Sequence, residues 1–164
     1  MSRVLGGNLA VTQDVNGNIP ILVRKTANES APASTAAVQD DDELFATVEA
    51  NSQYLVEGFF RHTAGSNTPD IRLNYSLPAG ASFAHFELGR TPASTATADT
   101  VEQSVATTGD VGRGSGTTQT CILMWGDLQV GATPGTFRVR FGQVTADVAL
   151  ITMNLGSWLR LTKL

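Results

Sequence analysis

The sequence is poor in the residues that build most catalytic and metal sites. Its 164 residues include a single cysteine, Cys121, so an intrachain disulfide is excluded. The two histidines, His62 and His85, lie far apart, whereas a zinc site needs three or four ligands, often in close-spaced pairs. No apolar run is long enough to cross a bilayer, and residues 1–7 lack the longer apolar stretch of a secretory signal. These absences favour a structural or binding protein over an enzyme, with no cofactor, no metal and no membrane partner.

Charged residues are also scarce, at 16% of the chain, and their balance is slightly acidic. Lys and Arg together number 11 against 15 Asp and Glu, which gives a net charge of -4. A protein that binds nucleic acid through phosphate contacts carries a basic patch or stripe, so no nucleic-acid partner is expected. Hydrophobic residues make up 41% of the chain, enough to form the core of one domain of this length.

Apolar and polar residues alternate from position 40 onward, which is typical of β-strands. Ile71, Leu73 and Tyr75 share one face of such a strand, and the residues between them are polar. Residues 118–130 hold the longest apolar run, which predicts a strand buried on both faces. Roughly eight strands follow one another at the spacing of a sandwich or barrel. The sequence therefore predicts an all-β fold, a jelly-roll-like β-sandwich over residues 41–164.

Residues 1–40 are polar and almost free of aromatic side chains. Asn16 and Gly17 separate two extended segments, residues 9–14 and 19–25, and this dipeptide is a strong signal for a β-hairpin. Residues 26–39 have the composition of a linker with nothing to bury. We therefore expect residues 1–40 to form an extended N-terminal arm that serves for attachment.

Four further features have a plain structural interpretation. Residues 40–43, DDDE, favour a solvated acidic turn over a cation site, with pairing to a neighbouring subunit's arginines as an alternative. Residues 112–116, GRGSG, indicate a flexible loop, because the lysine and helix of a phosphate-binding loop are missing. Cys121 is expected to be an inert core residue. His62 and His85 are expected to be surface or partly buried residues.

Large apolar side chains mark a candidate contact surface. In residues 53–62, Leu55 and Phe59 fall on the face opposite Tyr54, Val56 and Phe60, so one face forms an outer apolar stripe. Such stripes usually mark subunit contacts, although the N-terminal arm could cover this one instead. The two tryptophans lie in apolar strands and are expected in the core or an interface. The predicted partner residues are Leu9, Val11, Ile19, Ile21, Val23, Leu55, Phe59, Trp125 and Trp158.

Three segments together resemble one protein family. Residues 41–58 are similar to a "D-x-E-L-x-x-x-V-E-A-N-x-x-Y-x-V-x-G" opening. Residues 69–73 and 77–81 are similar to a "P-D-I-K-x…x-P-A-G-A" continuation, and residues 156–163 to a "G-S-W-L-R-L-T-R" terminus. These motifs resemble small virion proteins of tailed phages, notably phages of actinobacteria, described as head-decoration or minor tail proteins. The resemblance covers residues 40–164 and implies a trimeric jelly roll of the TNF/C1q type without catalytic residues.

The resemblance implies a capsid decoration protein located in the virion. Such a protein would form a homotrimer through its sandwich and dock on the major capsid protein through its N-terminal arm. The alternative is a minor tail or tail-fibre knob that binds a host surface glycan or protein, with Trp125, Trp158, His62 and Asn67 as candidate contacts. A cupin-type oxygenase is a third possibility, which two histidines support poorly. Many copies per particle would indicate the head, and a handful would indicate the tail.

Overall fold

The computed structural model describes residues 19–92, 101–106 and 111–164, and these contain strands and turns without a helix. Leucine, valine and aromatic residues at every second position give the strands one apolar face each. In chain order the strands are β1 (Ile21–Arg24), β2 (Glu29–Ser30), β3 (Gln39–Val48), β4 (Gln53–Ala64), β5 (Ile71–Ser76), β6 (Ser82–Gly89), β7 (Val101–Ala106), β8 (Val111–Arg113), β9 (Thr120–Gln129), β10 (Gly135–Gln143), β11 (Ile151–Met153) and β12 (Trp158–Lys163).

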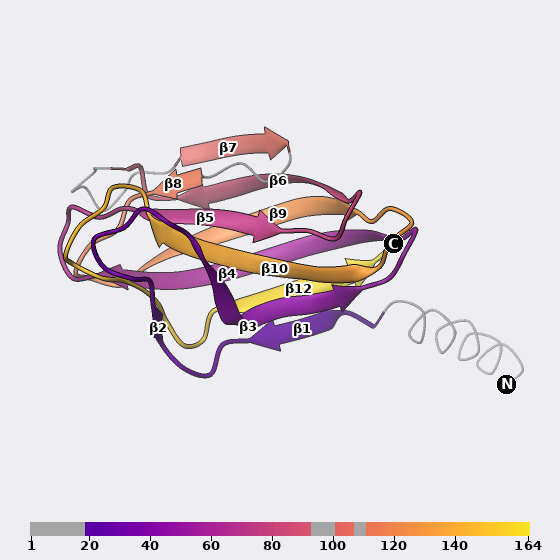
Figure 1. The fold of residues 1–164 in the computed structure, drawn as a ribbon, viewed down its shortest axis with the longest axis horizontal. Helices are drawn as coiled ribbons and strands as arrows, with labels where there is room; N and C mark the ends of the chain where they lie inside the picture. The colour runs from indigo at the N-terminus through magenta and orange to yellow at the C-terminus, as the bar shows by residue number, and fades with distance from the viewer. Residues whose placement is uncertain (1–18, 93–100, 107–110) are drawn as a thin grey trace, which may run out of the picture.

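The strands form two antiparallel sheets that pack face to face (Figure 1). The smaller sheet has the order β3-β10-β5-β8, and the larger has the order β1-β12-β4-β9-β6-β7, with β11 pairing β4 and β2. Strands β4-β9-β6-β7 opposite β3-β10-β5-β8 have the strand order of a jelly roll, two interlocked Greek keys. The predicted all-β jelly-roll sandwich is therefore confirmed, and β1 and β12 extend its larger sheet.

The core lies between the two sheets and is aromatic at one end. Phe83 of β6 meets Phe137 of β10 edge to face, with ring centroids 4.9 Å apart, and Tyr75 of β5 stacks on Phe137 at 5.7 Å. All three side chains are buried, and each stabilises the fold by about 1.5–3 kcal/mol through the area it removes from water. The alternation predicted for residues 71–75 is confirmed, because Ile71, Leu73 and Tyr75 all face this core.

The segment that precedes the jelly roll is attached to it more closely than its composition predicts. Strand β1 pairs with β12, with Ile21 opposite Leu161, and β2 pairs with β11. Ala31 is only 1% exposed, so the expectation that residues 26–39 bury nothing is wrong. The first half of the predicted hairpin lies outside the described residues, while its second half contains β1. The boundary at residue 40 stays a prediction.

The glycine-rich segment 112–116 is not a flexible loop where it is described. Arg113 and Ser115 are each 1% exposed. The Ser115 hydroxyl accepts a hydrogen bond from the amide of Ile71, and the Ser115 amide donates to Asp70. A Cβ at Gly114 would collide with the carbonyl of Thr91, so the glycine permits close packing of two backbones. The composition predicted a flexible loop, whereas the structure shows a segment that is packed closely against its neighbours.

Candidate functional site

The outer face of the larger sheet carries a continuous surface of large side chains, which we call the aromatic face. Strand register places its residues in two neighbouring rows across the sheet. One row contains Arg24, Trp158, Phe59, Leu123 and Leu88, and the other contains Leu22, Arg160, Glu57, Trp125 and Phe86. The rows arise because residues directly opposite on paired strands point to the same side of a sheet.

Two aromatic pairs anchor this face. Phe59 and Trp158 stack with ring centroids 6.3 Å apart, and Phe86 and Trp125 stack at 5.5 Å. Trp125 remains 38% exposed. Leu55, which lies two residues before Glu57 on the same side of β4, remains 40% exposed. An apolar surface of this kind on a folded domain is a candidate interaction site.

Strand β9 differs from its prediction at this face. The apolar run was expected to be buried on both faces, but only Ile122, Met124, Leu128 and Val130 are buried in the core. Cys121, Leu123 and Trp125 point outward, so the expected core position of Cys121 is also wrong: this free cysteine is exposed. The sequence has the pattern of a strand buried on both faces, but among the described residues only the face toward the core is covered.

The structure divides the predicted partner residues into three groups. Leu55, Phe59, Trp125 and Trp158 come together on the aromatic face. Ile21 and Val23 point to the opposite side of β1, toward the core residues Leu161 and Leu159. Ile19 is 61% exposed just before β1, and Leu9 and Val11 lie outside the described residues. That any of them contacts a partner stays a prediction.

Several members of the aromatic face were not predicted from the sequence: Leu22, Phe86, Leu88 and Leu123. The alternation in residues 82–88 placed Phe86 opposite in direction to the core residue Phe83, which was a usable signal. What the sequence did not contain was the pairing of β9 with β6, which brings Phe86 onto Trp125.

The outer face of the smaller sheet has a different character. Asp40 pairs with Arg138 at 3.2 Å and with Arg140 at 2.8 Å. The Arg138 guanidinium also lies 4.6 Å from the ring centroid of Phe45, a cation–π contact. Asp40 therefore pairs with arginines of its own chain. The outer face of the smaller sheet thus carries ion pairs, whereas the outer face of the larger sheet carries the large apolar side chains.

The acidic residues 40–43 do not form a solvated turn. Asp41 is fully buried, and its carboxylate lies 2.9 Å from the ammonium of Lys25, which is itself 2% exposed. Asp41 also accepts hydrogen bonds from the amides of Glu43 and Leu44. Burial alone would lower the pKa of Lys25, but hydrogen bonds to Glu29 and Asp41 and their negative charges outweigh it, so the pKa is raised. Lys25 thus fastens β1 to β3 through an internal ion pair.

A second buried polar cluster lies between the sheets around Glu87. The Tyr75 hydroxyl donates to Glu87 at 2.8 Å, and the His85 ring nitrogen Nε2 lies 3.4 Å from the same carboxylate. Arg113 lies 3.8 Å away and donates to the Glu87 carbonyl at 3.0 Å. Burial raises the pKa of Tyr75 well above its usual value, and the neighbouring Glu87 adds to this. Burial also lowers the pKa of Arg113.

Both histidines are buried, contrary to the expectation of surface or partly buried residues. His62 is 0% and His85 is 3% exposed. The His62 ring nitrogen Nε2 lies 2.8 Å from the Thr120 hydroxyl, and burial lowers the pKa of His62 to about 4. His62 is therefore unable to contact a glycan, whereas Asn67 is exposed. Among the described residues, no group of three or more His, Cys, Asp or Glu side chains could hold a metal ion.

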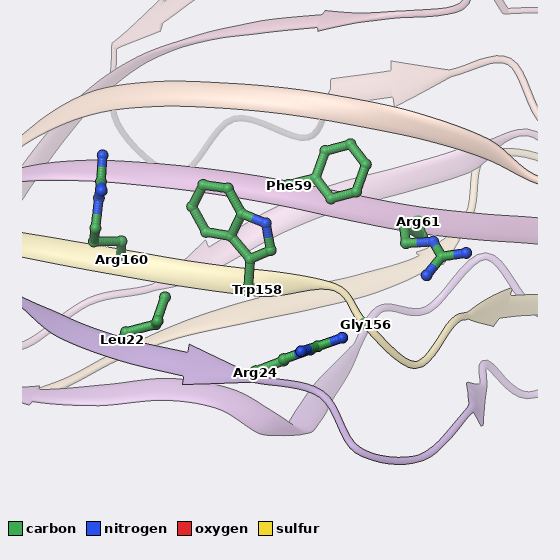
Figure 2. Close-up of a pocket in the computed structure, with 7 residues that line it drawn as sticks. All are labelled: Leu22, Arg24, Phe59, Arg61, Gly156, Trp158 and Arg160. Atoms are coloured by element: carbon green, nitrogen blue, oxygen red, sulfur yellow. The ribbon is translucent and has the colours of Figure 1, made fainter.

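A groove runs along the β1 edge of the aromatic face (Figure 2). It has a volume of about 720 Å³ and is lined by Leu22, Arg24, Phe59, Arg61, Gly156, Trp158 and Arg160. Trp158 and Phe59 form its apolar part, and three guanidinium groups surround them. Arg160 is neutralised by Glu57, to which it donates at 2.6 Å. We refer to this feature as the arginine groove.

These features define a jelly-roll β-sandwich with an apolar outer face and a cationic groove. No protein-family model and no curated protein matches the chain. Among solved structures, the chain is similar to a chain of the "Structure of infectious bursal disease virus Gt strain", with 7% sequence identity and a TM-score of 0.24. The match covers 89% of this chain and 41% of the viral chain, so this chain spans about two fifths of its length. A likeness this weak assigns no family. In the described part of the chain, no helix is long and apolar enough to span a membrane.

Proposed function

We propose that the chain is a structural virion protein that decorates a capsid and assembles with copies of itself through the aromatic face. The observation that carries this proposal is the presence of two stacked aromatic pairs, half-buried except for the exposed Trp125, on the outer side of β12, β4, β9 and β6. The resemblance of residues 40–164 to tailed-phage virion proteins supports the same role and favours a homotrimer.

Assembly would bury the side chains that the sheet leaves exposed. A standard stable interface removes about 800 Å² per partner from water. Tryptophan side chains at the centre of such an interface often contribute 2 kcal/mol or more each. Trp125, with Phe86 stacked on it and Leu123 beside it on β9, has the composition of such a centre.

Docking on the major capsid protein is the second part of the proposal, and it assigns this role to residues 1–40. Strand β1 ends the hydrogen-bonded path of the larger sheet, with β12 as its partner on one side. An extended segment of a capsid subunit can add to such an edge through main-chain hydrogen bonds. Leu9, Val11, Ile19 and Ile21 are the apolar residues that we assign to this contact. The role is mechanical, clamping neighbouring capsid subunits, and uses no catalytic residue, metal or cofactor.

A second candidate function is a minor tail or tail-fibre knob that recognises a host surface glycan. The arginine groove favours it, because an open groove that combines exposed aromatic surface with guanidinium groups suits a polar ring-shaped ligand. Trp158 belongs to both candidate surfaces, whereas Trp125 is not among the residues that line the groove.

The decoration function is tested on the particles that contain this protein. Particles assembled without it should lose their contents at lower temperature, or on treatment with chelator, than complete particles. Equal resistance of the two kinds of particle would contradict the proposal. Counting copies per particle separates the two candidates, because decoration of the head requires many copies and a tail knob only a few.

A further inference from the structure

We infer that the arginine groove is a binding site for an acidic sugar, a ring that carries a carboxylate or phosphate group. This inference rests on the second function proposed above, and the groove shares Trp158 and Phe59 with the aromatic face. It is argued from the charge of the groove, from the atoms that converge in it and from its apolar wall.

Two of the three arginines have no acidic partner in the part of the chain that the structure describes. Among the described residues, Arg24 forms no ion pair, and Arg61 donates only to neutral groups, at 2.6 Å to the Gln119 side chain and 3.4 Å to the Leu155 carbonyl. Both approach the same point beside Gly156. A Cβ placed on this glycine would lie 2.7 Å from Nη1 of Arg61 and 3.8 Å from Nη2 of Arg24. Two like charges that converge without a counter-ion form a site for an anion.

The backbone at Gly156 keeps this point accessible. Gly156 has a φ of +84°, a conformation that favours glycine. Its amide donates to the Lys25 carbonyl at 2.9 Å, which holds the turn against the end of β1. The turn therefore brings Arg24 and Arg61 together from two different strands, and the absence of a side chain at Gly156 lets the Arg61 guanidinium lie against the turn. Guanidinium groups bind carboxylate and phosphate through paired hydrogen bonds, so either anion fits there.

The apolar wall specifies what the anion is attached to. Trp158 is opposite Arg24 in the strand register and is half-buried, with Phe59 stacked beside it. Leu22, which is 65% exposed, adds a further apolar side chain to the lining. A sugar ring presents a C–H face that packs on an indole and hydroxyl groups that accept from arginine. The groove volume of about 720 Å³ lies within the range typical of small-ligand sites, about 300–1,000 Å³.

The chain offers a direct reporter for this site because it has two tryptophans. In a Trp125→Phe variant the only tryptophan is Trp158, and its fluorescence can be followed during titration with sugars. Methyl glucuronide supplies the carboxylate, glucose 6-phosphate supplies the phosphate, and methyl glucoside is the neutral match of both. N-acetylglutamate, used as its α-amide so that only the side-chain carboxylate is charged, supplies a carboxylate of protein type without a sugar ring. Light scattering on the same samples reports the assembly state separately.

We expect a saturable response to methyl glucuronide or glucose 6-phosphate, and the stronger of the two identifies the anion. Methyl glucoside and N-acetylglutamate should bind at least about tenfold more weakly, since each lacks one charged or ring contact. Arg24→Gln and Arg61→Gln should each weaken the binding by about tenfold. Arg140→Gln removes the same charge from the outer face of the smaller sheet and should leave binding unchanged.

Three results would overturn the inference. The first is no saturable response to either acidic sugar, and the second is an equal response to methyl glucoside. The third is equal binding of N-acetylglutamate, which would assign the groove to an acidic protein side chain. Failure of the unmodified protein to assemble, with sugar binding by the Trp125→Phe variant intact, would contradict the proposed decoration role alone, so the two failures are distinguishable.

Discussion

Glu87→Gln should destabilise the fold far more than an equivalent change at the surface. Glu87 is fully buried and is the carboxylate that faces Arg113, itself 1% exposed. In the variant Arg113 keeps its hydrogen bonds to the carbonyls of Gly112 and Glu87 but loses its counter-charge. Removing one partner of a buried pair typically costs about 3–5 kcal/mol. For a domain of this size, 1 kcal/mol lowers Tm by about 2–4 °C, so we expect a decrease of about 6–20 °C.

Glu57→Gln is the matched control for this experiment. Glu57 also pairs with an arginine, Arg160, whose side chain is 44% exposed, and exposed pairs contribute about 0–1 kcal/mol. Urea unfolding of both variants at pH 7 measures the two free-energy changes directly. The double variant Glu87→Gln with Arg113→Met should recover part of the loss, because no buried charge is then left unpaired. If Glu87→Gln costs no more than Glu57→Gln, the buried ion pair is not a determinant of stability and our reasoning is wrong.

Two further predictions concern buried groups near the ends of the sandwich. The pKa of His62 is about 4 in the fold against 6.5 in the unfolded chain, so its stabilising effect is complete above pH 6.5 and is lost as pH falls through about 4. This loss amounts to about 3 kcal/mol by linkage, and His62→Gln should remove it from urea unfolding curves measured between pH 7 and pH 4; an unchanged pH dependence would contradict the assignment. Lys25→Met should leave Asp41 buried without its partner and cost about 3–5 kcal/mol. Cleavage by a protease near residues 21–30 should then precede cleavage of the sandwich, and simultaneous cleavage would show that Lys25 does not fasten β1.

The alternation of apolar and polar residues predicted most of the fold. Residues 53–62 and 71–75 present the faces that their pattern predicts, because a period of two fixes which side chains share a side of the sheet. The aromatic face was anticipated in part for the same reason, through Leu55 and Phe59. Its full extent depends on which strands pair, and the pairing of β6 with β9 joins residues nearly forty positions apart. No local pattern contains that information.

Buried polar groups were the main source of wrong expectations. Asp41, His62 and Arg113 were assigned to a solvated turn, to surface or partly buried positions and to a flexible loop, yet each is almost fully buried, as is Lys25, the partner of Asp41. Three of them are charged groups, and each is placed inside together with an opposite charge. Burial of this kind is decided by long-range partners: Lys25 and Asp41 are 16 residues apart, and His62 and Thr120 are 58 apart. The packing of residues 26–39 and 112–116 also depends on distant partners, so their composition did not predict it.

Assembly through the aromatic face is the central claim, and the mass of the protein in solution tests it most directly. Light scattering at two concentrations should give three times the chain mass of 17.3 kDa for the unmodified protein. Trp125→Ser should reduce the mass to that of one chain, whereas Phe45→Ser should not. Phe45 is the matched control, because it is also 38% exposed but lies on the smaller sheet. A clean monomer at both concentrations, or dissociation by Phe45→Ser and not by Trp125→Ser, would contradict the account.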